Sequence, residues 1–372
     1  MQILHISNGF SNSKVHVNLC KKLGENGIEQ TVYCPVRSVN ELGKNAIDIN
    51  NTVVIHDLVI KPFHRYAYHF KCHAIFHSLK QKVNCKTVDL CHASTLFTDG
   101  GVAYKVFKKF NIPYIVAVRS TDVNVFLNKA PNTWPSAKKT LLNASKIIFV
   151  SPALKEKFCK HKYIASFLAK IEDKMVIMRN GIDDYWIDNV NSEQLQNNHQ
   201  VLYVGTMIRR KNPLMLIQSI LDLRTKYPDI KLNIIGSTGE DEEAVKEYAR
   251  QNKGVIVYHG QINNKEELLK NYRANSLFVL PSVAETFGLV YLEALSQNLP
   301  VVYTKGDGID GFLAENNGVG ITYPTLDNIM EAIIKVFEKQ SNYSNSGFDF
   351  EQFRWDVIAK RYRAMYKDVL KK

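Results

Sequence analysis

The chain has 372 residues, of which 45% are hydrophobic and 23% are charged, as in a globular protein with room for two cores. It contains no apolar run of the ~20 residues that a membrane span needs, and its N-terminus, MQILHISNGF, lacks the basic and apolar regions of a signal peptide. Six cysteines are scattered without a CxxC pair. This pattern suits reduced thiols better than a disulfide framework or a zinc site, so we expect a cytoplasmic protein.

Positive charge is concentrated in the first half of the chain. Residues 1–185 contain 26 Lys and Arg against 13 Asp and Glu, whereas residues 186–372 contain 22 against 23. A basic half indicates a partner rather than a fold. An anionic membrane surface, a phosphorylated acceptor and nucleic acid all fit this charge, and the alternative is a basic surface that is merely solvated.

The first half reads as alternating strands and helices. A strand, QILHIS, leads to a turn at Asn8 and Gly9 and then to a helix from about Val15 to Gly24. Short apolar runs follow, most of them separated by helical stretches: QTVYCP, VVIHDLVI, VDLCHAS, YIVAVRS, KIIFVS and MVIMRN. Continuous apolar runs are typical of parallel strands buried on both faces. Residues 1–187 are therefore predicted to form one Rossmann-like domain.

Residues 61–82, KPFHRYAYHFKCHAIFHSLKQK, are predicted to form one helix with Phe63, Tyr66 and Phe70 along one side and basic residues interspersed. Aromatic and basic helices are typical of membrane interfaces. We therefore expect peripheral attachment to the anionic inner face of the cytoplasmic membrane, with a core-packing helix as the alternative. Three histidines recur every four residues, at His69, His73 and His77. Such histidines are more often packing or surface residues than zinc ligands.

The second half repeats the alternation. A polar stretch, residues 188–200, is predicted to be the linker. Residues 201–350 are predicted to form a second Rossmann-like domain, and residues 351–372 a final amphipathic helix. The expected helices of the second domain cover residues 213–227, 242–252, 265–274 and 288–297.

The segment PSVAETFGLVYLEAL, residues 281–295, is the most informative one for chemistry. A strand ends at Pro281, a loop with Glu285 follows, and a helix begins near Gly288. Ligands of open α/β sheets sit at the carboxyl ends of strands, and backbone N–H groups at a helix start suit a diphosphate. Glu293 lies among apolar residues of this helix, where an idle carboxylate would be costly.

A second strand–loop–helix segment, VGTMIRRKNPLMLIQSI, covers residues 204–220. Its loop contains Arg209, Arg210 and Lys211. A guanidinium can bind two phosphate oxygens at once and an ammonium adds a point charge, so this loop suits a leaving diphosphate. The alternative is a basic turn on the surface.

The 281–295 segment resembles the E-x7-E signature of the retaining family 4 glycosyltransferases of the GT-B fold. The resemblance implies two facing Rossmann-like domains and a C-terminal helix that crosses back to the N-terminal domain. It also implies that Glu293 holds the ribose of a nucleotide and that Glu285 contacts the donor sugar. The backbone amides of Phe287, Gly288 and Leu289 would face the diphosphate.

Residues 204–212 resemble the G-R-x4-K pattern of the same family, with Gly205 and Lys211 at the matching positions. The usual arginine after the glycine is Thr206 here, and Arg209 or Arg210 is expected to take its place. The resemblance therefore implies that Lys211, Arg210 and Glu285 are catalytic. Arg209, Thr206 and Gly205 join the donor-binding residues.

Residues 92–126 resemble the family's HAH…HGTD region. His92 and Asp122 match it, while Arg119 stands where the family has a histidine. The glycine-rich turn after the first strand is reduced to Gly9. These four residues are expected to line the acceptor cleft of the N-terminal domain.

The resemblance implies a retaining glycosyltransferase that moves a sugar from a nucleotide-diphosphate sugar, with UDP favoured, to a saccharide or lipid-linked saccharide. Assembly of surface polysaccharide or lipopolysaccharide is the expected context, with no metal or other cofactor and no nucleic acid as a partner. Thr206 and Arg119 leave open a degenerate, binding-only member. A nucleotide-sugar epimerase and a nucleic-acid-binding protein that uses the basic half are also left open.

Overall fold

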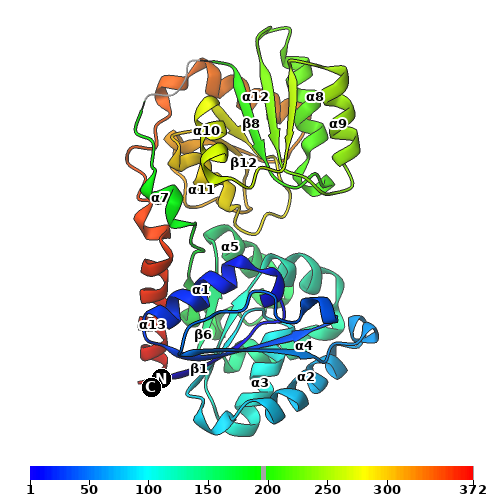
Figure 1. The fold of residues 1–372 in the computed structure, drawn as a ribbon. Coiled ribbons are helices and arrows are strands. Elements are labelled where there is room, and N and C mark those ends of the chain that lie inside the picture. Colours follow the sequence, from blue (N-terminus) through cyan, green and yellow to red (C-terminus); the bar gives the residue numbers. More distant parts are fainter. Residues whose placement is uncertain (194–197, 372) are drawn as a thin grey trace. The chain divides into compact units, whose positions relative to one another are not determined.

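The computed structural model describes residues 1–193 and 198–371, so part of the predicted linker 188–200 lies outside the described residues. The chain divides into two compact units. The first unit comprises Met1–Val150, Leu154–Gly181 and Trp355–Lys372, and the second comprises Ser151–Ala153 and Ile182–Arg354. Figure 1 shows the fold of each unit.

The first unit is built on a sheet of seven strands: β1 (Gln2–Ile6), β2 (Glu29–Val36), β3 (Thr52–Leu58), β4 (Leu90–Ala93), β5 (Tyr114–Val118), β6 (Lys146–Phe149) and β7 (Met175–Ile177). Their order is β3-β2-β1-β4-β5-β6-β7, and every pair is parallel. The interior strand β1 pairs Ile6 with Tyr33 on one side and with Ala93 on the other. Parallel strands are joined by crossover helices that cover both faces, which is why these strands read as apolar runs in the sequence.

The helices of this unit are α1 (Lys14–Glu25), α2 (Tyr68–Lys82), α3 (Thr98–Phe110), α4 (Trp134–Asn143), α5 (Pro152–Lys160), α6 (Lys162–Ala165) and α13 (Trp355–Leu370), and only the first two residues of α5 are assigned to the second unit. The side chain of Ser13 caps α1 by accepting a hydrogen bond from the His16 N–H at 3.3 Å. Helix α2 packs on α3, and α3 packs on α4.

The C-terminal helix α13 returns to the first unit, as predicted. It contacts α1, beside which it lies in Figure 1. Its buried residues join one core cluster with β1 and α1; the cluster includes Ile3, Leu19, Leu23, Trp355, Ile358, Ala359, Tyr362, Tyr366 and Val369. Burial of this apolar face attaches the end of the chain to its first helix.

The second unit has six parallel strands: β8 (Gln200–Val204), β9 (Lys231–Ile235), β10 (Ile256–Gly260), β11 (Leu277–Val279), β12 (Val301–Thr304) and β13 (Gly318–Ile321). Its helices are α7 (Asp184–Asp188), α8 (Pro213–Leu223), α9 (Glu242–Gln251), α10 (Lys265–Ala274), α11 (Leu289–Ser296) and α12 (Leu326–Glu338). The strand order is β10-β9-β8-β11-β12-β13. Both sheets therefore have their first strand third in the order, next to their fourth, and the prediction of two Rossmann-like α/β folds is confirmed.

Residues 61–82 do not form one helix, so that prediction was wrong. Pro62–Arg65 form a separate 3-10 turn, and Ala67, with φ −113° and ψ 68°, interrupts the chain before α2 begins at Tyr68. Helix α2 buries Tyr68, Cys72, Ile75 and Leu79, which recur at helical spacing, and it packs on α3. The predicted aromatic side chains remain exposed, by 54% at Phe63, 84% at Tyr66 and 71% at Phe70. In the described part of the chain, no helix is long and apolar enough to cross a membrane.

Candidate functional site

Three loops of the second unit follow strands that are neighbours in the sheet. Strands β8, β11 and β12 lie side by side and are parallel, so the loops after them meet at one edge. These loops are residues 205–212, 280–288 and 305–311. In open α/β sheets this edge is where ligands bind.

The loop after β8 presents the basic residues. Arg209–Lys211 form a 3-10 turn, and Asn212, with φ 52°, turns the chain into α8. A Cβ atom at Gly205 would lie 3.4 Å from both the Lys211 and the Tyr203 side chains, so Lys211 extends over this glycine. Thr206 is exposed, and its carbonyl accepts a hydrogen bond from Tyr203 Oη at 2.9 Å.

The loops after β8 and β11 are joined by hydrogen bonds. The Val283 N–H donates to the Arg210 carbonyl at 2.6 Å, and Asn212 Nδ2 donates to the Pro281 carbonyl at 2.7 Å. These two bonds hold the basic turn at residues 209–211 in a defined position relative to the 280–288 loop, which contains Glu285.

Glu285 lies at the centre of this edge. Its Oε2 is 3.6 Å from Lys211 Nζ and 4.0 Å from Arg210 Nη1, and it accepts a hydrogen bond from Ser282 Oγ at 3.2 Å. The side chains of Glu285 and Lys211 are only 11% and 15% exposed, while that of Arg210 is 50% exposed. The structure thus brings together three residues that the sequence analysis expected at one site. The limited exposure of Glu285 and Lys211 strengthens the electrostatic interaction between these two side chains.

The loop after β12 supports Glu285 from the other side, and the sequence analysis missed it. Asp307 Oδ2 accepts a hydrogen bond from the Ala284 N–H at 2.7 Å, and the Gly308 N–H donates to the Glu285 carbonyl at 3.1 Å. Gly308 has φ 55°, and a Cβ atom there would lie 3.1 Å from Glu285 Cγ. The sequence signal was available, since GDGIDG follows a predicted strand.

Phe287 and Gly288 lie directly before α11, with Gly288 at its N-cap position. Phe287 is buried at 2% exposure and packs its ring against Phe312, with the centroids 5.8 Å apart. Gly288 has φ 75°, and a Cβ atom there would lie 2.5 Å from the Tyr291 ring. Only glycine fits this position without strain. No side chain of the described residues caps the start of α11 at Leu289, so its first N–H groups suit an anion.

Glu293 lies one turn further along α11 and is partly buried. Its Oε2 accepts a hydrogen bond from Tyr272 Oη at 3.0 Å. Burial raises the pKa of Glu293 to about 7, and the nearby Asp183 contributes to the increase. A carboxyl group with one hydroxyl donor and unused acceptor capacity fits hydroxyl groups of a ligand.

Asp122 of the first unit joins two loops at the carboxyl edge of its sheet. It is 2% exposed and accepts hydrogen bonds from the N–H groups of Leu96, Phe97 and Arg119 at 3.1, 3.3 and 2.8 Å. The loop after β4 is thereby connected to the loop after β5. Burial raises the pKa of Asp122 to about 6, although the three backbone donors oppose the shift.

Arg119 is held beside Asp122. Its Nε donates to the Ser94 carbonyl at 3.1 Å, and its Nη2 lies 3.2 Å from His16 Nε2. Burial, together with the charge of Arg119, lowers the pKa of His16 to about 3, so a neutral imidazole accepts this bond. The ring's Nδ1 lies 3.0 Å from Ser7 Oγ. His16 was missed because nothing in its local sequence distinguishes it.

His92 and Gly9 have different surroundings. His92 is 2% exposed, with Nδ1 2.8 Å from Tyr366 Oη and its ring stacked on Tyr362 of α13. It therefore lies in the core beneath the C-terminal helix. Gly9 has φ −102°, and a Cβ atom there would meet no atom within 4 Å, so its backbone does not require glycine.

The histidines of α2 at positions 69, 73 and 77 are all exposed. Among residues 1–193 and 198–371, no group of three or more His, Cys, Asp or Glu side chains is arranged to hold a metal ion.

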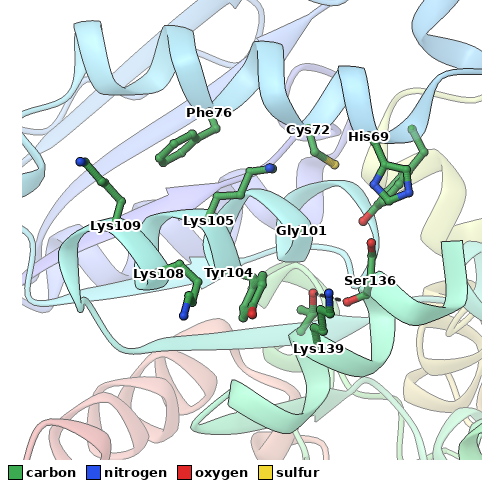
Figure 2. Close-up of a pocket in the computed structure, with 12 residues that line it drawn as sticks. His69, Cys72, Phe76, Gly101, Tyr104, Lys105, Lys108, Lys109, Ser136 and Lys139 are labelled. Atoms are coloured by element: carbon green, nitrogen blue, oxygen red, sulfur yellow. Dashed lines mark hydrogen bonds between the residues drawn. The ribbon is translucent and has the colours of Figure 1, made fainter.

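A basic groove of about 520 Å³ runs over α3, between α2 and α4. In Figure 2, Phe76 and Cys72 of α2 face Tyr104 and Lys105 of α3, with Ser136 and Lys139 of α4 on the opposite wall. Four lysines line the groove: Lys105, Lys108, Lys109 and Lys139. No acidic residue is among the described residues that line it, so its net charge is positive.

Comparison with known proteins matches both halves of the chain. Residues 13–185 match Glycosyltransferase Family 4, and residues 186–347 match the Glycosyl transferases group 1. An uncharacterized glycosyltransferase of Methanocaldococcus jannaschii is 25% identical over 331 residues, which cover 85% of each chain. The capsular polysaccharide biosynthesis glycosyltransferase CapM of Staphylococcus aureus is 29% identical over 255 residues, covering 63% of this chain and 64% of CapM.

Solved structures show the same fold. Anabaena HepE in complex with UDP has a TM-score of 0.74 at 16% identity, and the match covers 99% of this chain and 100% of HepE. The complex of HepE with UDP-glucose has a TM-score of 0.70 at the same identity and coverage.

Proposed function

Because the chain belongs to glycosyltransferase family 4, has the GT-B fold and is therefore an enzyme that uses a nucleotide-sugar donor, we propose that it is a retaining hexosyltransferase with a UDP-sugar donor. Its proposed acceptor is a saccharide or lipid-linked saccharide in the assembly of surface polysaccharide or lipopolysaccharide. The complexes of HepE with UDP and UDP-glucose support the choice of donor. The likeness to CapM supports the choice of pathway.

One observation carries the donor proposal: Glu285 Oε2 lies 3.6 Å from Lys211 Nζ and 4.0 Å from Arg210 Nη1 at the edge where the Gly288 turn opens α11. Breaking the bond between sugar and diphosphate leaves negative charge on the departing phosphate. Cations and helix-end N–H groups that are already in position stabilise this charge. Lys211 and Arg210 would bind the leaving diphosphate, together with the backbone amides of residues 287–289.

Glu285 has the proposed role of positioning the sugar, and Glu293 that of accepting hydrogen bonds from the ribose hydroxyls. The acceptor would attack the face from which the diphosphate departs, which retains the anomeric configuration. The proton of the acceptor hydroxyl would pass to an oxygen of the leaving diphosphate. Because the acceptor attacks the sugar directly, no carboxylate needs to form a covalent bond with the sugar. Thr206 and Arg209 are exposed beside this edge and are proposed to contact the donor.

The test is ligand-induced stabilisation of the full chain by UDP, GDP and ADP and by their sugars. We expect UDP and one UDP-sugar to raise the melting temperature. Glu293→Ala should lose this shift, while Glu331→Ala, which removes an exposed glutamate of α12, should keep it. If no nucleotide has an effect, the donor proposal is wrong. If UDP binds but the UDP-sugar is never turned over with any acceptor preparation, the chain is a binding-only member.

The first unit has the proposed role of binding the acceptor at an anionic membrane surface. The exposed Phe63, Tyr66 and Phe70 support this role, since aromatic rings at a surface can enter a lipid interface. The basic groove of Figure 2 adds positive charge to the same unit. Each basic residue near an anionic surface strengthens the attraction to it.

Co-sedimentation with vesicles tests the membrane role. We expect binding to vesicles that contain phosphatidylglycerol and weak binding to pure phosphatidylcholine. Replacing Phe63, Tyr66 and Phe70 together by serine should weaken binding. Replacing Tyr323 of the second unit, which is 70% exposed, is the matched control. Equal binding to both vesicle types would contradict the proposal.

A further inference from the structure

A second cavity of the first unit, of about 830 Å³, opens at the carboxyl edge of the sheet. Segments that follow four different strands enclose it. Arg37 comes directly after β2, residues 60–66 follow β3, Thr98 opens α3 after β4, and Phe126 follows β5. Tyr68 and Lys71 of α2 complete the wall. This edge is the ligand-binding edge of such sheets, yet the sequence analysis assigned these residues no donor or acceptor group and expected only a membrane surface at residues 61–82.

The cavity wall is strongly cationic. Its charged lining residues are all basic: Arg37, Lys61, Arg65 and Lys71, with His64 beside them. No aspartate or glutamate belongs to its lining within the described ranges. Three of the four cations are exposed at the rim, while Lys71 is buried at 9% exposure.

Lys71 is a buried ammonium group with little compensation. Its Nζ donates one hydrogen bond, to Thr98 Oγ1 at 3.1 Å, and Thr98 also lines the cavity. The nearby Asp99 is already engaged, since it accepts bonds from Asn8 N at 3.2 Å and from Thr95 Oγ1 at 3.0 Å. Burial lowers the pKa of Lys71, the charge of Asp99 opposes this shift, and that of Arg37 adds to it. A buried ammonium group with a single hydrogen-bond acceptor favours an anion that supplies further acceptors.

Aromatic rings form the other part of the wall. Phe126 stacks on Phe97, with centroids 4.6 Å apart and an angle of 15° between the rings. Tyr68 is fixed by a hydrogen bond from its Oη to the Phe97 carbonyl at 2.8 Å, and Tyr66 stands at the rim with 84% exposure. Ring faces beside a cluster of cations suit a ligand that joins an anionic group to a ring or an apolar chain.

We propose that this cavity binds a phosphate or diphosphate group of the acceptor, and that Lys71 determines the specificity for that group. Four cations exceed what a single carboxylate needs. Arg37 and Arg65 can each bind two phosphate oxygens, and Lys71 adds a point charge at the floor. The inference rests on the proposed transferase function, because it names the chemistry of the acceptor. The phosphate could belong to a soluble phosphosugar or to a lipid-linked acceptor.

Isothermal titration of the full chain, saturated with UDP so that the donor edge is occupied, tests the proposal. The probes are phenyl phosphate, its neutral counterpart phenyl β-glucoside, and geranyl diphosphate. We expect phenyl phosphate and geranyl diphosphate to bind and phenyl β-glucoside to bind at least about 10-fold more weakly. Tighter binding of geranyl diphosphate than of phenyl phosphate would indicate a lipid-linked acceptor, and the reverse a soluble phosphosugar.

The variants locate the site. Lys71→Met should weaken binding of the phosphate probes about 10-fold, whereas Lys86→Met, which removes an exposed lysine outside the cavity, should not. Arg37→Gln at the exposed rim should weaken it about threefold, and it serves as the test if Lys71→Met fails to fold. Failure of both phosphate probes to bind, or unchanged affinity in the folded variants, would overturn the proposal. If the chain does not bind UDP, only the donor proposal is contradicted. The phosphate probes are then titrated without UDP, and the comparison of Lys71→Met with Lys86→Met still locates their site.

Discussion

The sheets of the two units share the strand order 3-2-1-4-5-6, to which the first unit adds a seventh strand, but the units use polar residues differently at the carboxyl edge of the sheet. In the second unit, Glu285, Lys211 and Arg210 face one another, and their side chains are 11%, 15% and 50% exposed, respectively. In the first unit, Asp122 and Asp99 are 2% and 0% exposed, and backbone N–H groups donate to both carboxylates.

The difference shows that topology places an edge, while the side chains decide whether that edge is structural or open to a ligand. The acidic residues of the first unit hold its loops together. The loops of the second unit are held by backbone bonds, such as that from Val283 to Arg210, and by Asp307, which accepts a hydrogen bond from the Ala284 N–H. The Glu285 carboxylate is therefore left facing its two cations. In the first unit, Arg119 lies beside Asp122, while a cluster of four cations lies around Lys71.

The largest expected effect is that of replacing Lys211. It would show that residues needed for sugar transfer lie in the second unit. Lys211→Met should reduce the rate of sugar transfer about 100- to 1,000-fold, because a preorganised charge at the leaving diphosphate is lost. Initial rates of UDP release measure this. Lys253→Met, an exposed lysine of the same unit, should keep the rate. A loss of less than about threefold in Lys211→Met would contradict the assignment.

Asp122 tests the structural character of the first unit. Asp122→Ala leaves three backbone N–H groups without their acceptor, so the free energy of unfolding should fall by about 2–4 kcal/mol. Denaturant unfolding measures the change. Asp48→Ala, at an exposed position, is the control. UDP should still bind Asp122→Ala under native conditions, since the donor edge belongs to the other unit. A stable variant that has lost only activity would instead make Asp122 a functional residue.

The glycine turns of the two units can be compared directly. Gly288→Ala should weaken UDP binding about 10-fold, because the new Cβ would lie 2.5 Å from the Tyr291 ring at a φ of 75°. Gly9→Ala should leave stability and UDP binding unchanged, because its Cβ meets nothing within 4 Å. Calorimetric titration with UDP measures both variants. Equal effects would remove the distinction between a required glycine and a replaceable one.

The smallest expected effect is a pH dependence of UDP binding. Burial raises the pKa of Glu293 to about 7, so the group is mostly protonated at pH 6 and mostly ionised at pH 8. The ionised form accepts hydrogen bonds from ribose hydroxyls better, so UDP affinity should rise roughly fivefold between these values. Glu293→Gln should bind UDP weakly with a flat profile. A profile of Glu293→Gln as steep as that of the wild type would assign the titration to another group.

Elements with strong local signals were predicted well. The helix Lys265–Ala274 has the predicted limits, and the C-terminal helix packs where the family resemblance implied. Helix α8 ends at Leu223 instead of continuing to residue 227. Helix α12 was missed although Ile329, Ile333 and Val336 repeat at helical spacing and are buried. The prediction of one helix over residues 61–82 was wrong because the aromatic pattern continues across the break at Ala67.

The proposed donor edge of the second unit could be located from sequence because each of its parts is local: a strand, a turn and a helix start within about fifteen residues. Gly205, Lys211, Glu285 and Gly288 are all of this kind. The environment of His92 could not be derived in this way, since its partner Tyr366 is 274 residues distant along the chain. The cavity around Lys71 is assembled from segments that follow four strands. Local sequence specifies which elements form, but burial and the partners of polar groups depend on which distant segments pack together.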